Sequence, residues 1–467
     1  MKPYRTLIFA EIVQESALAV GGNQPHGLVD TPLARDGSHR PVLRGSTLAG
    51  SFIATARRIA GQLPRAITID NDDKEGLTPS SWRFAHSHPL AGEPVTAFFQ
   101  HVSIDPRTQA AKDDHLFSLE ALPVGTRWNF ELEIVPAPGI EFTDLEALAA
   151  AVLAEWQLPG GARLGRGSRH GYGWCHLEDI VIVRLDKRQA AHWPDALVPE
   201  RSAGEWKDAL QAQGACIFNL DQFRRQTGMA LTPARRCVAE LGGSLHVGER
   251  QDEFGRGYGL DTLSVGGHAR MQLQAQEFFS RVIPPRDVPF RPEDFDPDFA
   301  ITAMPDADGR LTPYVPGASI RGVWRAALQR HFRANGGDAA LVDELFGSTD
   351  KAGCLSVADA VPADDNWRML LQQHVAIDEL TGGAYGSAKF DRLCIAKARF
   401  VWRARLEAND DSHAQRLAEP LLKLLHELGD GHLPLGGGIW RGHGHIRWQL
   451  DGLRVRALGA GHEGENA

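Results

Sequence analysis

The stretch PVLRGSTLAGSFIATARRI at residues 41–59 returns in altered form at residues 313–331, as PYVPGASIRGVWRAALQRH. Two further motifs recur on either side of this match, QHVSID at 100–105 with QHVAID at 373–378, and the glycine-rich stretch 160–173 with 436–444. The three offsets are 272, 273 and 271 residues, measured at the pairs Gly45 and Gly317, Asp105 and Asp378, and Gly171 and Gly442. Motifs that keep both order and spacing indicate an internal duplication. The chain is predicted to contain two copies of one module.

Composition limits what such a chain can be. It has 467 residues, of which 43% are hydrophobic and 23% charged, as in ordinary globular proteins of two or three domains. No apolar run approaches the roughly 18 residues of a membrane span, and the start lacks the pattern of a signal peptide. The five cysteines are widely spaced without a CxxC pair, which argues against disulfides and zinc knuckles. We therefore expect a cytoplasmic protein with no membrane partner. With a net charge of −9, any nucleic-acid binding requires locally gathered basic groups.

Apolar patterning predicts the order β-α-β-β-α-β in each copy. In the first copy we expect strands at 5–13, 96–105, 125–135 and 172–185. The predicted fold class is α+β, with two tandem ferredoxin-like (RRM-like, βαββαβ) modules and inserted loops or hairpins. Each module would have a four-stranded antiparallel sheet with two helices on one face.

Two helices define the expected core of the first copy. Ser46 or Thr47 is expected to cap the first helix. Thr143 and Glu146 form a capping-box pattern for the second helix, which corresponds to 416–428 in the second copy. The apolar face of the first helix and its counterpart share a helical spacing, and consist of Leu48, Phe52, Ala56 and Ile59, and of Ile320, Trp324 and Leu328.

The predicted boundaries are a first module at 1–185, a linker with a short helix at 186–236, a second module at 237–455 and a disordered tail at 456–467. The start of the second copy has two alternatives. A constant offset places its first strand near 270–279. A better local match pairs the segment from Ala10 with the segment from Ala239, which leaves an insertion at about 265–305 and makes Asp261 the counterpart of Asp30.

Three groups of residues are candidates for function. The turns Gly45-Ser46-Thr47 and Gly317-Ala318-Ser319 open helices, where unpaired N–H groups favour a phosphate, although each is equally a tight turn with an N-cap. The glycine-rich loops would hold phosphates through forked arginine donors, or be flexible connectors. Their candidate residues are Arg163, Arg166, Arg169, His170 and Gly171, and Arg441 and His443.

The third group is the pair of loop aspartates, Asp30 and Asp261. A carboxylate among glycines can hold a hard cation or orient a 2′-hydroxyl for attack, and its alternative role is an Asx turn. Asp105 and Asp378 are interpreted as structural turn residues, and His26 as an accessory to Asp30 or a solvated histidine. No GK[ST] phosphate loop and no GxSxG motif occur, which argues against nucleotide hydrolysis and serine-hydrolase chemistry.

Together these motifs resemble the RAMP superfamily, the repeat-associated RNA-binding proteins of CRISPR systems. The resemblance rests on an aspartate loop followed by the Gly-Ser-Thr turn, on Ile104-Asp105 leading to Leu116-Phe117, and on the loop Arg169-His170-Gly171-Tyr172-Gly173, with their counterparts including Leu345-Phe346-Gly347. The chain looks most like tandem backbone subunits of type III (type III-D-like) effector complexes.

That resemblance implies binding of CRISPR RNA (crRNA) along both modules, and partnership with further RAMP subunits and a large polymerase-like subunit. It also implies cleavage of target RNA by a probable metal-dependent endoribonuclease. Asp30 and Asp261 would be catalytic with Mg²⁺ or Mn²⁺, which they would also help to hold, and RNA would be gripped by the turns and loops above together with Arg321. Departures from the family pattern are Arg44 in place of proline and Ala318 in place of serine.

Three alternatives stay open at the level of sequence. The chain could be a non-catalytic crRNA scaffold. It could be a stand-alone endoribonuclease that processes CRISPR repeats through metal-free histidine chemistry. It could also be a duplicated ferredoxin-like protein that binds no RNA.

Overall fold

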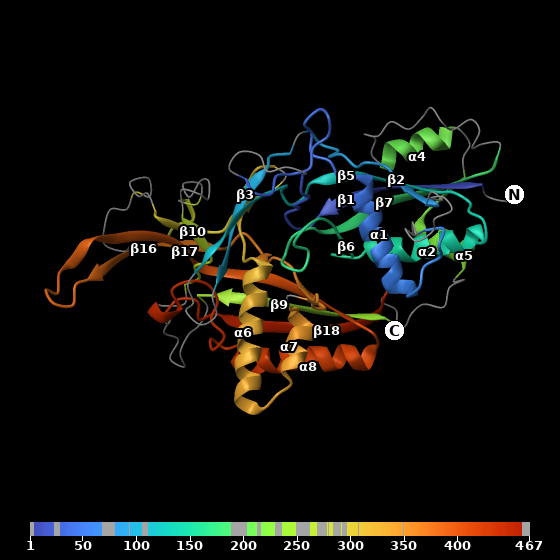
Figure 1. Cartoon of the computed structure of the whole chain (residues 1–467). Helices are drawn as coiled ribbons and strands as arrows, with labels where there is room; N and C mark the ends of the chain where they lie inside the picture. Colours follow the sequence, from blue (N-terminus) through green and yellow to red (C-terminus); the bar gives the residue numbers. More distant parts are fainter. Residues whose placement is uncertain are drawn as a thin grey trace.

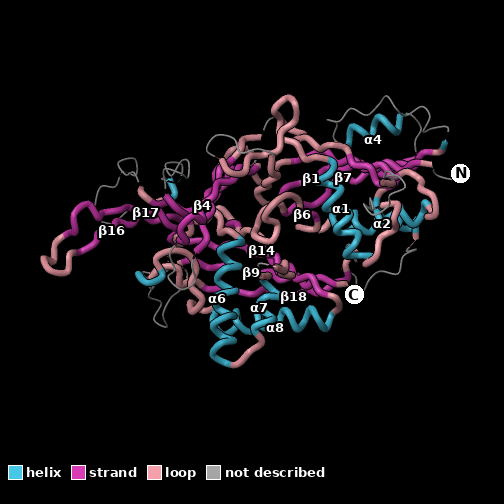
Figure 2. The backbone as a smooth tube through the Cα atoms, in the orientation of Figure 1, coloured by secondary structure: helices cyan, strands magenta, loops and turns pink. Residues whose placement is uncertain are grey.

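The computed structural model of the chain describes residues 4–22, 29–67, 80–92, 94–104, 111–187, 203–212, 216–228, 236–248, 262–268, 278, 280–283, 291, 297–306, 308–348 and 350–459. It is a mixed α/β structure in which helices pack on largely antiparallel sheets (Figures 1 and 2). None of the helices in these ranges combines the length and the apolar character that crossing a membrane requires.

The first half contains, in chain order, β1 (Arg5–Gln14), α1 (Gly45–Ala60), β2 (Trp82–Phe84), β3 (Ala97–Ile104), β4 (Ala111–Ala121), β5 (Arg127–Ile134), α2 (Phe142–Trp156), β6 (Ala162–Arg163), β7 (Trp174–Leu185), α4 (Ala203–Ala212), β8 (Cys216–Phe218) and α5 (Leu220–Thr227). Its main sheet has the strand order β2-β5-β1-β7-β6, and β8 pairs with β7. A separate two-stranded sheet consists of β3 and β4.

The second half contains β9 (Cys237–Val247), β10 (Gly266–His268), β11 (Phe299–Ile301), β12 (Ala303–Pro305), β13 (Leu311–Pro313), α6 (Gly317–Asn335), α7 (Ala339–Phe346), β14 (Leu355–Val357), β15 (Val361–Pro362), β16 (Arg368–Ile377), β17 (Ala384–Ala408), α8 (Asp411–Leu428), the 3₁₀ helix η4 (Ile439–Arg441) and β18 (Arg447–Ala457). Its sheet has the order β10-β11-β17-β9-β18, with β14, β15 and β16 also paired to β17. β16 and the start of β17 form a hairpin that extends away from the rest of the chain (Figure 1).

The prediction that residues 96–105 form a strand of the main sheet was wrong. β3 spans most of this stretch but pairs only with β4, and the short strand β2 occupies the place beside β5. Burial explains the difference. Trp82 of β2 is buried and packs edge-on against Phe52 of α1 at 5.2 Å between ring centroids, whereas Phe98 and Val102 of β3 are exposed.

The predicted helix faces are confirmed in both halves. The four apolar positions of α1 and the three of α6 are all buried. At equivalent positions, Phe52 of α1 packs on Phe130 of β5, and Trp324 of α6 packs on Trp402 of β17. The helical period therefore identified the surfaces on which each half closes its core.

The predicted helix caps were wrong. α1 begins at Gly45 after Arg44, so that Ser46 and Thr47 lie inside the first turn and no side chain caps it from the N-cap position. α2 begins at Phe142 with Glu141 as its N-cap, and the capping box does not form. Instead, Glu146 is fully buried and binds two groups of flanking strands, accepting hydrogen bonds from the Thr6 hydroxyl and the Arg184 guanidinium.

The central strand of the second sheet is β9. β9 runs from Cys237 and lies between β17 and β18, in the same position as β1 between β5 and β7. The described ends of the expected insertion, β10 and β11, pair antiparallel with each other. Most residues between them lie outside the described ranges.

The stretch expected to be a linker contains α4, β8 and α5, which pack on the first half. Ala203 of α4 belongs to a small cluster with Leu7 and Phe9 of β1, on the face opposite α1 and α2. Phe223 of α5 is fully buried in the main core of the first half. At the other end, β18 reaches Ala457, and residues 460–467 lie outside the described ranges.

The two halves meet through buried ion pairs. Glu155, at the end of α2, pairs with Arg405 of β17 and binds Arg456 of β18 through two hydrogen bonds of 2.6 and 2.9 Å. Nearby, Glu15 of the first half pairs with Arg403 of β17. Because charges removed from water require partners, these pairs hold the halves in one arrangement.

Acidification should destabilise this contact. Burial alone raises the pKa of Glu15 and Glu155, but His176 and Arg403 for the first, and Arg456 and Arg405 for the second, outweigh it and lower both values to about 2 from 4.5. A depressed folded-state pKa contributes stability above the unfolded value, which is lost as pH falls from about 4.5 toward 2.

We expect each group to cost about 2 kcal/mol of the free energy of unfolding at about pH 3, relative to pH 7. Urea titrations across this range measure it, and Glu155→Gln and Glu15→Gln should each flatten the pH dependence. A wild-type free energy of unfolding that stays constant down to about pH 3 would contradict the ion-pair geometry.

Candidate nucleic-acid interface

Asp30 lies exposed on the segment that follows β1, and Ser118 of β4 holds its carboxylate. The backbone N–H and the hydroxyl of Ser118 donate to Asp30 Oδ2 at 2.7 and 2.9 Å, and the Asp30 N–H donates to the same hydroxyl oxygen at 2.9 Å. The hydrogen bonds from Ser118, the backbone one first, lower the pKa of Asp30 below its usual value. The carboxylate is therefore ionised and fixed in direction at neutral pH.

The glycine-rich loop of the first half reaches the same place. Arg166 is exposed, and its Nη1 donates to the Thr31 hydroxyl at 3.1 Å, one residue beyond Asp30. The backbone N–H of Arg166 donates to the Ala19 carbonyl at 2.9 Å, which anchors the loop against the end of β1. The fold thus brings the loop aspartate and one of the predicted arginines together across more than 130 residues of sequence.

A histidine and two aromatic rings form a cluster on and around β3 and β4. His101 of β3 stacks on Phe117 of β4, with ring centroids 5.1 Å apart, and its Nε2 lies 2.8 Å from the hydroxyl of Tyr172. Burial lowers the pKa of His101, so its ring is neutral at physiological pH. Phe117 precedes Ser118 on β4, so its exposed ring lies on the opposite face of the strand from the Ser118 hydroxyl that binds Asp30.

The second half repeats the arrangement of rings. His374 of β16 stacks on Phe390 of β17 at 4.8 Å, with the same interplanar angle of 18° found in the first half. His443 takes the place of Tyr172 and lies 5.8 Å from His374. Its Nδ1 is 2.8 Å from the Thr262 hydroxyl, and burial and the charge of Arg392 lower its pKa.

Arg392 gives the second half a positive charge that the first half lacks at this point. Its guanidinium lies 5.6 and 5.8 Å from the rings of Phe299 and Phe390, and Arg441 lies 5.6 Å from Phe390. Arg392 is only 8% exposed, yet its Nε and Nη1 have no hydrogen-bond partner among the described residues. Burial and the charge of Arg441 lower its pKa. Unsatisfied buried donors beside further cationic groups are suited to an anionic ligand.

The helix-opening turns have internal partners. The N–H of Gly45 donates to His86 Nδ1 at 3.0 Å, and the N–H of Gly317 donates to Asp359 Oδ1 at 2.7 Å. Glycine is required at both because a Cβ would lie 2.4 Å from the carbonyl oxygen of the adjacent strand. The structure therefore favours the tight-turn interpretation over the phosphate-site interpretation for these two glycines.

The hydroxyl residues of the same turns lie within the helices. Ser46 is exposed, while Thr47 and Ser319 are half-buried. The backbone N–H groups of Thr47 and Ser319 already donate to the carbonyls of Arg44 and Pro316, at 2.8 and 2.9 Å.

Two predicted RNA-binding arginines bind other parts of the chain. Arg163 pairs with Glu407 and donates to the Ser356 hydroxyl of the second half, which corrects its prediction as an RNA contact. Arg321 is buried and donates to the carbonyls of Phe346 and Leu355, so the same correction applies to it. Both guanidiniums are occupied by the chain itself.

The remaining loop residues of the first half flank this contact. His170 Nε2 lies 3.3 Å from Arg321 Nη1, and desolvation with the charges of Arg321 and Arg169 lowers the pKa of His170 to about 4. Gly171 has φ 112° and lies against the carboxylate of Asp359, where a Cβ would not fit. Arg169 is exposed, and its carbonyl accepts a hydrogen bond from the N–H of Val357.

Some predicted residues cannot be placed. Asp261, His26 and Asp105 lie outside the described residues. Asp378 is the turn residue that the sequence predicts, because its Oδ1 accepts hydrogen bonds from the Thr381 and Leu380 N–H groups at 2.8 and 3.1 Å.

This duplicated arrangement agrees with the family comparison. A family model of the RAMP superfamily matches residues 12–176 and 303–447, more than half of the chain in two separate regions. The chain belongs to the RAMP superfamily. A search of curated proteins finds no match to it. Membership implies a CRISPR-associated RNA-binding protein that works in complexes of RNA and protein.

A metal ion would have few protein ligands in this RAMP protein. No group of three His, Cys, Asp or Glu side chains that could hold one occurs within the described ranges. At Asp30 the hydrogen bonds from Ser118 go to Oδ2, and the exposed carboxylate could supply Oδ1 as one ligand of Mg²⁺ or Mn²⁺, which commonly share protein carboxylates with substrate phosphates. The residues therefore fit a divalent cation only if RNA supplies further ligands.

Sequence reasoning missed the ring pairs and Arg392. The repeated QHV motif contains both His101 and His374 and could have indicated them as equivalent residues. The prediction from this motif concerned only the aspartates at its end. Phe117 and Phe390 also keep the 273-residue offset. Arg392 gave no such signal, because its counterpart at that offset is Leu119.

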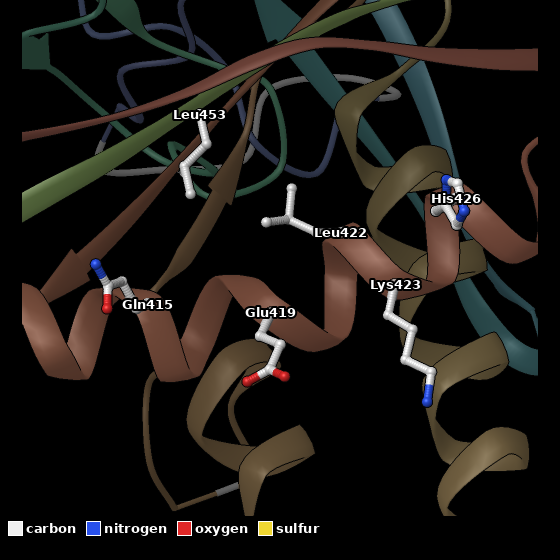
Figure 3. A pocket seen from close by; sticks show the side chains of 6 residues that line it. All are labelled: Gln415, Glu419, Leu422, Lys423, His426 and Leu453. Atoms are coloured by element: carbon white, nitrogen blue, oxygen red, sulfur yellow. The ribbon is translucent and has the colours of Figure 1, made fainter.

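A shallow hollow elsewhere on this RAMP protein contains none of these groups. It lies over α8 and β18, with charged side chains along the helix that point outward (Figure 3). Its lining residues are Gln415, Glu419, Leu422, Lys423, His426 and Leu453.

Proposed function

We propose that this RAMP protein is a backbone subunit of a type III CRISPR effector complex, which binds crRNA along its two halves and cleaves complementary target RNA. One observation carries the proposal. In the first half, the Asp30 carboxylate is fixed by Ser118 of β4, Arg166 binds the adjacent Thr31, and β3 and β4 carry the stacked rings of His101 and Phe117, a ring pair that recurs in the second half. A carboxylate next to a cation and stacking surfaces is suited to a ribose-phosphate strand.

We also propose that each half is one ferredoxin-like module, as is typical of the family. The four strands β7-β1-β5-β2 of the first half and β18-β9-β17-β14 of the second have the same antiparallel order, with helices α1 and α2, or α6 and α8, following the first and third strands. This order supports the proposal, because a βαββαβ module places its fourth strand beside the first and its second beside the third.

Exposed rings and apolar side chains support RNA binding through base stacking. Phe98 and Phe117 are exposed on β3 and β4. On the projecting β16–β17 hairpin, Leu380 and Tyr385 are 90% and 63% exposed. Aromatic platforms with nearby arginines bind single-stranded or splayed RNA with stacking energies of about 1–3 kcal/mol per base.

The proposed reaction is an internal transesterification of the target RNA. The oxygen of a 2′-hydroxyl bonds to the adjacent phosphorus, the bond to the 5′-oxygen breaks, the hydroxyl proton is removed and the 5′-oxygen gains a proton. The products are a 2′,3′-cyclic phosphate and a 5′-hydroxyl. Asp30 would accept the proton or orient the hydroxyl. A divalent cation, Mg²⁺ or Mn²⁺, would stabilise phosphate charge when bound by Asp30 and the RNA.

The proposed partners are crRNA, target RNA, further RAMP subunits and a large polymerase-like subunit. The test is to assemble the complex on crRNA and incubate it with end-labelled complementary RNA, with and without EDTA. We expect cleavage with cyclic-phosphate ends that EDTA abolishes. Tight crRNA binding without cleavage would support a scaffold instead. Cutting of the CRISPR repeat in EDTA would support a processing nuclease, and failure to bind any RNA would refute all three functions.

Arg392→Leu should strengthen the fold and weaken RNA binding. The substitution removes a buried guanidinium, two of whose nitrogens have no hydrogen-bond partner in the part of the chain that the structure describes, and installs the residue that the first half has at this position. The free energy of unfolding should therefore rise by about 1–3 kcal/mol. RNA affinity should fall with a salt dependence lower by about one phosphate contact.

The matched control for this prediction is Arg399→Leu, an exposed arginine on the same strand, for which we expect a change in unfolding free energy within about 0.5 kcal/mol. Urea unfolding and filter binding at several salt concentrations measure the two effects. Lower stability of Arg392→Leu with unchanged RNA affinity would show that the guanidinium has a structural role.

A further inference from the structure

The two halves can be aligned through their backbone hydrogen bonds, independently of sequence similarity. In the first half, Thr31 pairs in parallel with Leu119 of β4. In the second, Phe299 of β11 pairs in parallel with Arg392 of β17, the residue 273 positions after Leu119. The residue before Thr31 is Asp30, and the residue before Phe299 is Asp298.

The carboxylates of these two aspartates bind the same backbone group. Asp30 Oδ2 accepts a hydrogen bond from the N–H of Ser118 at 2.7 Å. Asp298 Oδ2 accepts one from the N–H of Asp391 at 2.9 Å, and Asp391 lies 273 positions after Ser118. In both cases the carboxylate is held next to the strand that carries the stacked phenylalanine.

The chain after each aspartate keeps the same register. The N–H of Ala34 donates to the carbonyl of Val20 at 2.7 Å, and that of Thr302 donates to Val265 at 2.7 Å. Ala34 follows Asp30 by four residues, as Thr302 follows Asp298. The aspartates therefore occupy equivalent positions on equivalent segments.

The same comparison aligns the residues directly after Asp261 with residues of the first half that precede Asp30. Leu263 exchanges backbone hydrogen bonds with Ile395, as Leu18 does with Leu122, which lies 273 positions before Ile395. The carbonyl of Thr262 accepts from the N–H of Gly444, as the carbonyl of Ala17 accepts from Gly173. Residue 261 thus aligns with residue 16, which is 14 positions before Asp30.

We propose that Asp298, and not Asp261, is the counterpart of Asp30 in the second half, and that it forms a second cleavage site with Arg392 as the phosphate-binding group. The buried guanidinium of Arg392 is the second observation, because its Nε and Nη1 have no hydrogen-bond partner among the described residues, which suits an anion, and Arg392 pairs with Phe299, the residue after Asp298. The inference rests on the proposed function, since it assigns the same transesterification to a second phosphodiester.

In that reaction Asp298 accepts the proton of a target 2′-hydroxyl or orients that hydroxyl, as proposed for Asp30. The 2′-oxygen bonds to the adjacent phosphorus as the bond between phosphorus and the 5′-oxygen breaks. The proton leaves the 2′-oxygen and one is gained by the 5′-oxygen. Arg392 donates hydrogen bonds to the non-bridging phosphate oxygens. Each chain then cuts a bound target at two positions, one opposite each half.

The test uses the complex assembled on crRNA, with target RNA labelled at either end, and compares wild type with Asp30→Asn, Asp298→Asn, Asp261→Asn and the double variant of Asp30 and Asp298. Asparagine retains an oxygen that can accept the Asp391 N–H, so the segment keeps its anchor. We expect two cuts from wild type and from Asp261→Asn. Each of the other single variants should lose one cut by about 10²-fold or more, and the double variant both.

Loss of a cut in Asp261→Asn with retention in Asp298→Asn would overturn the assignment while the proposed function stands. A wild-type complex that cuts at one position only, unaffected by Asp298→Asn, would also overturn it. A wild-type complex that binds target without any cut would refute the proposed function itself, and this inference with it. Thermal melting and crRNA affinity are measured for every variant, including Asp298→Glu, which keeps a carboxylate. These controls distinguish a cut that is lost with the carboxylate from a cut that is lost because the protein no longer folds.

Discussion

Asp30→Asn should slow cleavage of target RNA at one position by about 10²–10⁴-fold while leaving crRNA affinity unchanged. The carboxylate is ionised and held by Ser118, and asparagine keeps an acceptor for that residue but loses the negative charge. Proton acceptance and cation binding both need the charge, whereas the shape of the loop does not. Single-turnover cleavage of end-labelled target by the assembled complex measures the effect.

The matched control for this prediction is Asp36→Asn. Asp36 lies on the same segment, and its carboxylate accepts hydrogen bonds from the N–H groups of Ser38 and Arg40, as a turn residue does. Its cleavage rate should stay within about threefold of wild type, as for a change away from the reacting groups. Equal rates for Asp30→Asn and wild type would remove Asp30 from the reaction.

Glu155→Ala should lower the free energy of unfolding by about 3–5 kcal/mol. The side chain joins the halves, and its loss leaves Arg405 and Arg456, whose side chains are 5% and 9% exposed, without their shared carboxylate. Two buried positive charges would then repel each other in a low-dielectric contact. Urea unfolding at neutral pH measures the loss, and we expect the contact between the halves to be affected first.

Glu344→Ala is the control for an ordinary ion pair, because Glu344 binds the exposed Arg416. This substitution should lower the free energy of unfolding by less than about 1 kcal/mol. A second comparison replaces Glu155, Arg405 and Arg456 together by methionine. Since a well-packed apolar substitute removes the desolvation cost, this triple variant should recover much of the loss. A Glu155→Ala variant as stable as wild type would show that the triad does not hold the halves together.

The sequence predicted best what depends on a single element. The faces of α1 and α6 follow from helical spacing, which is a property of each helix by itself. Asp30 and Arg166 stay predictions as RNA-binding residues, and nothing in the sequence showed that Arg166 binds Thr31, the residue after Asp30. The wrong helix caps involve distant partners, because Gly45 at the start of α1 donates to His86, 41 residues away, and Glu146 of α2 binds Thr6, 140 residues away.

Contacts between segments that are distant in the sequence determined the features that the sequence did not predict. The β3 stretch is apolar enough for the main sheet, yet Trp82 fills the core there and leaves β3 to pair with β4. Asp298, the proposed counterpart of Asp30, lies 268 residues after it, so a search at the offsets of the other motifs, 271 to 273, misses it. Its assignment depends on the hydrogen bond to Asp391 and on the backbone pairing around Phe299 and Thr302.

The sequence alone predicts a duplicated protein with two cores of helices and strands, and its repeated motifs indicate the family to which it belongs. The tertiary structure decided which charged residues bind other parts of the chain, such as Arg163 across the two halves and Arg321 within the second, and which remain exposed, such as Arg166. The physical reason is the distance along the sequence between the residues that interact. Periodicity records which face of one element is buried, whereas the partner of a guanidinium or a carboxylate depends on segments hundreds of residues away that meet only when both halves have folded.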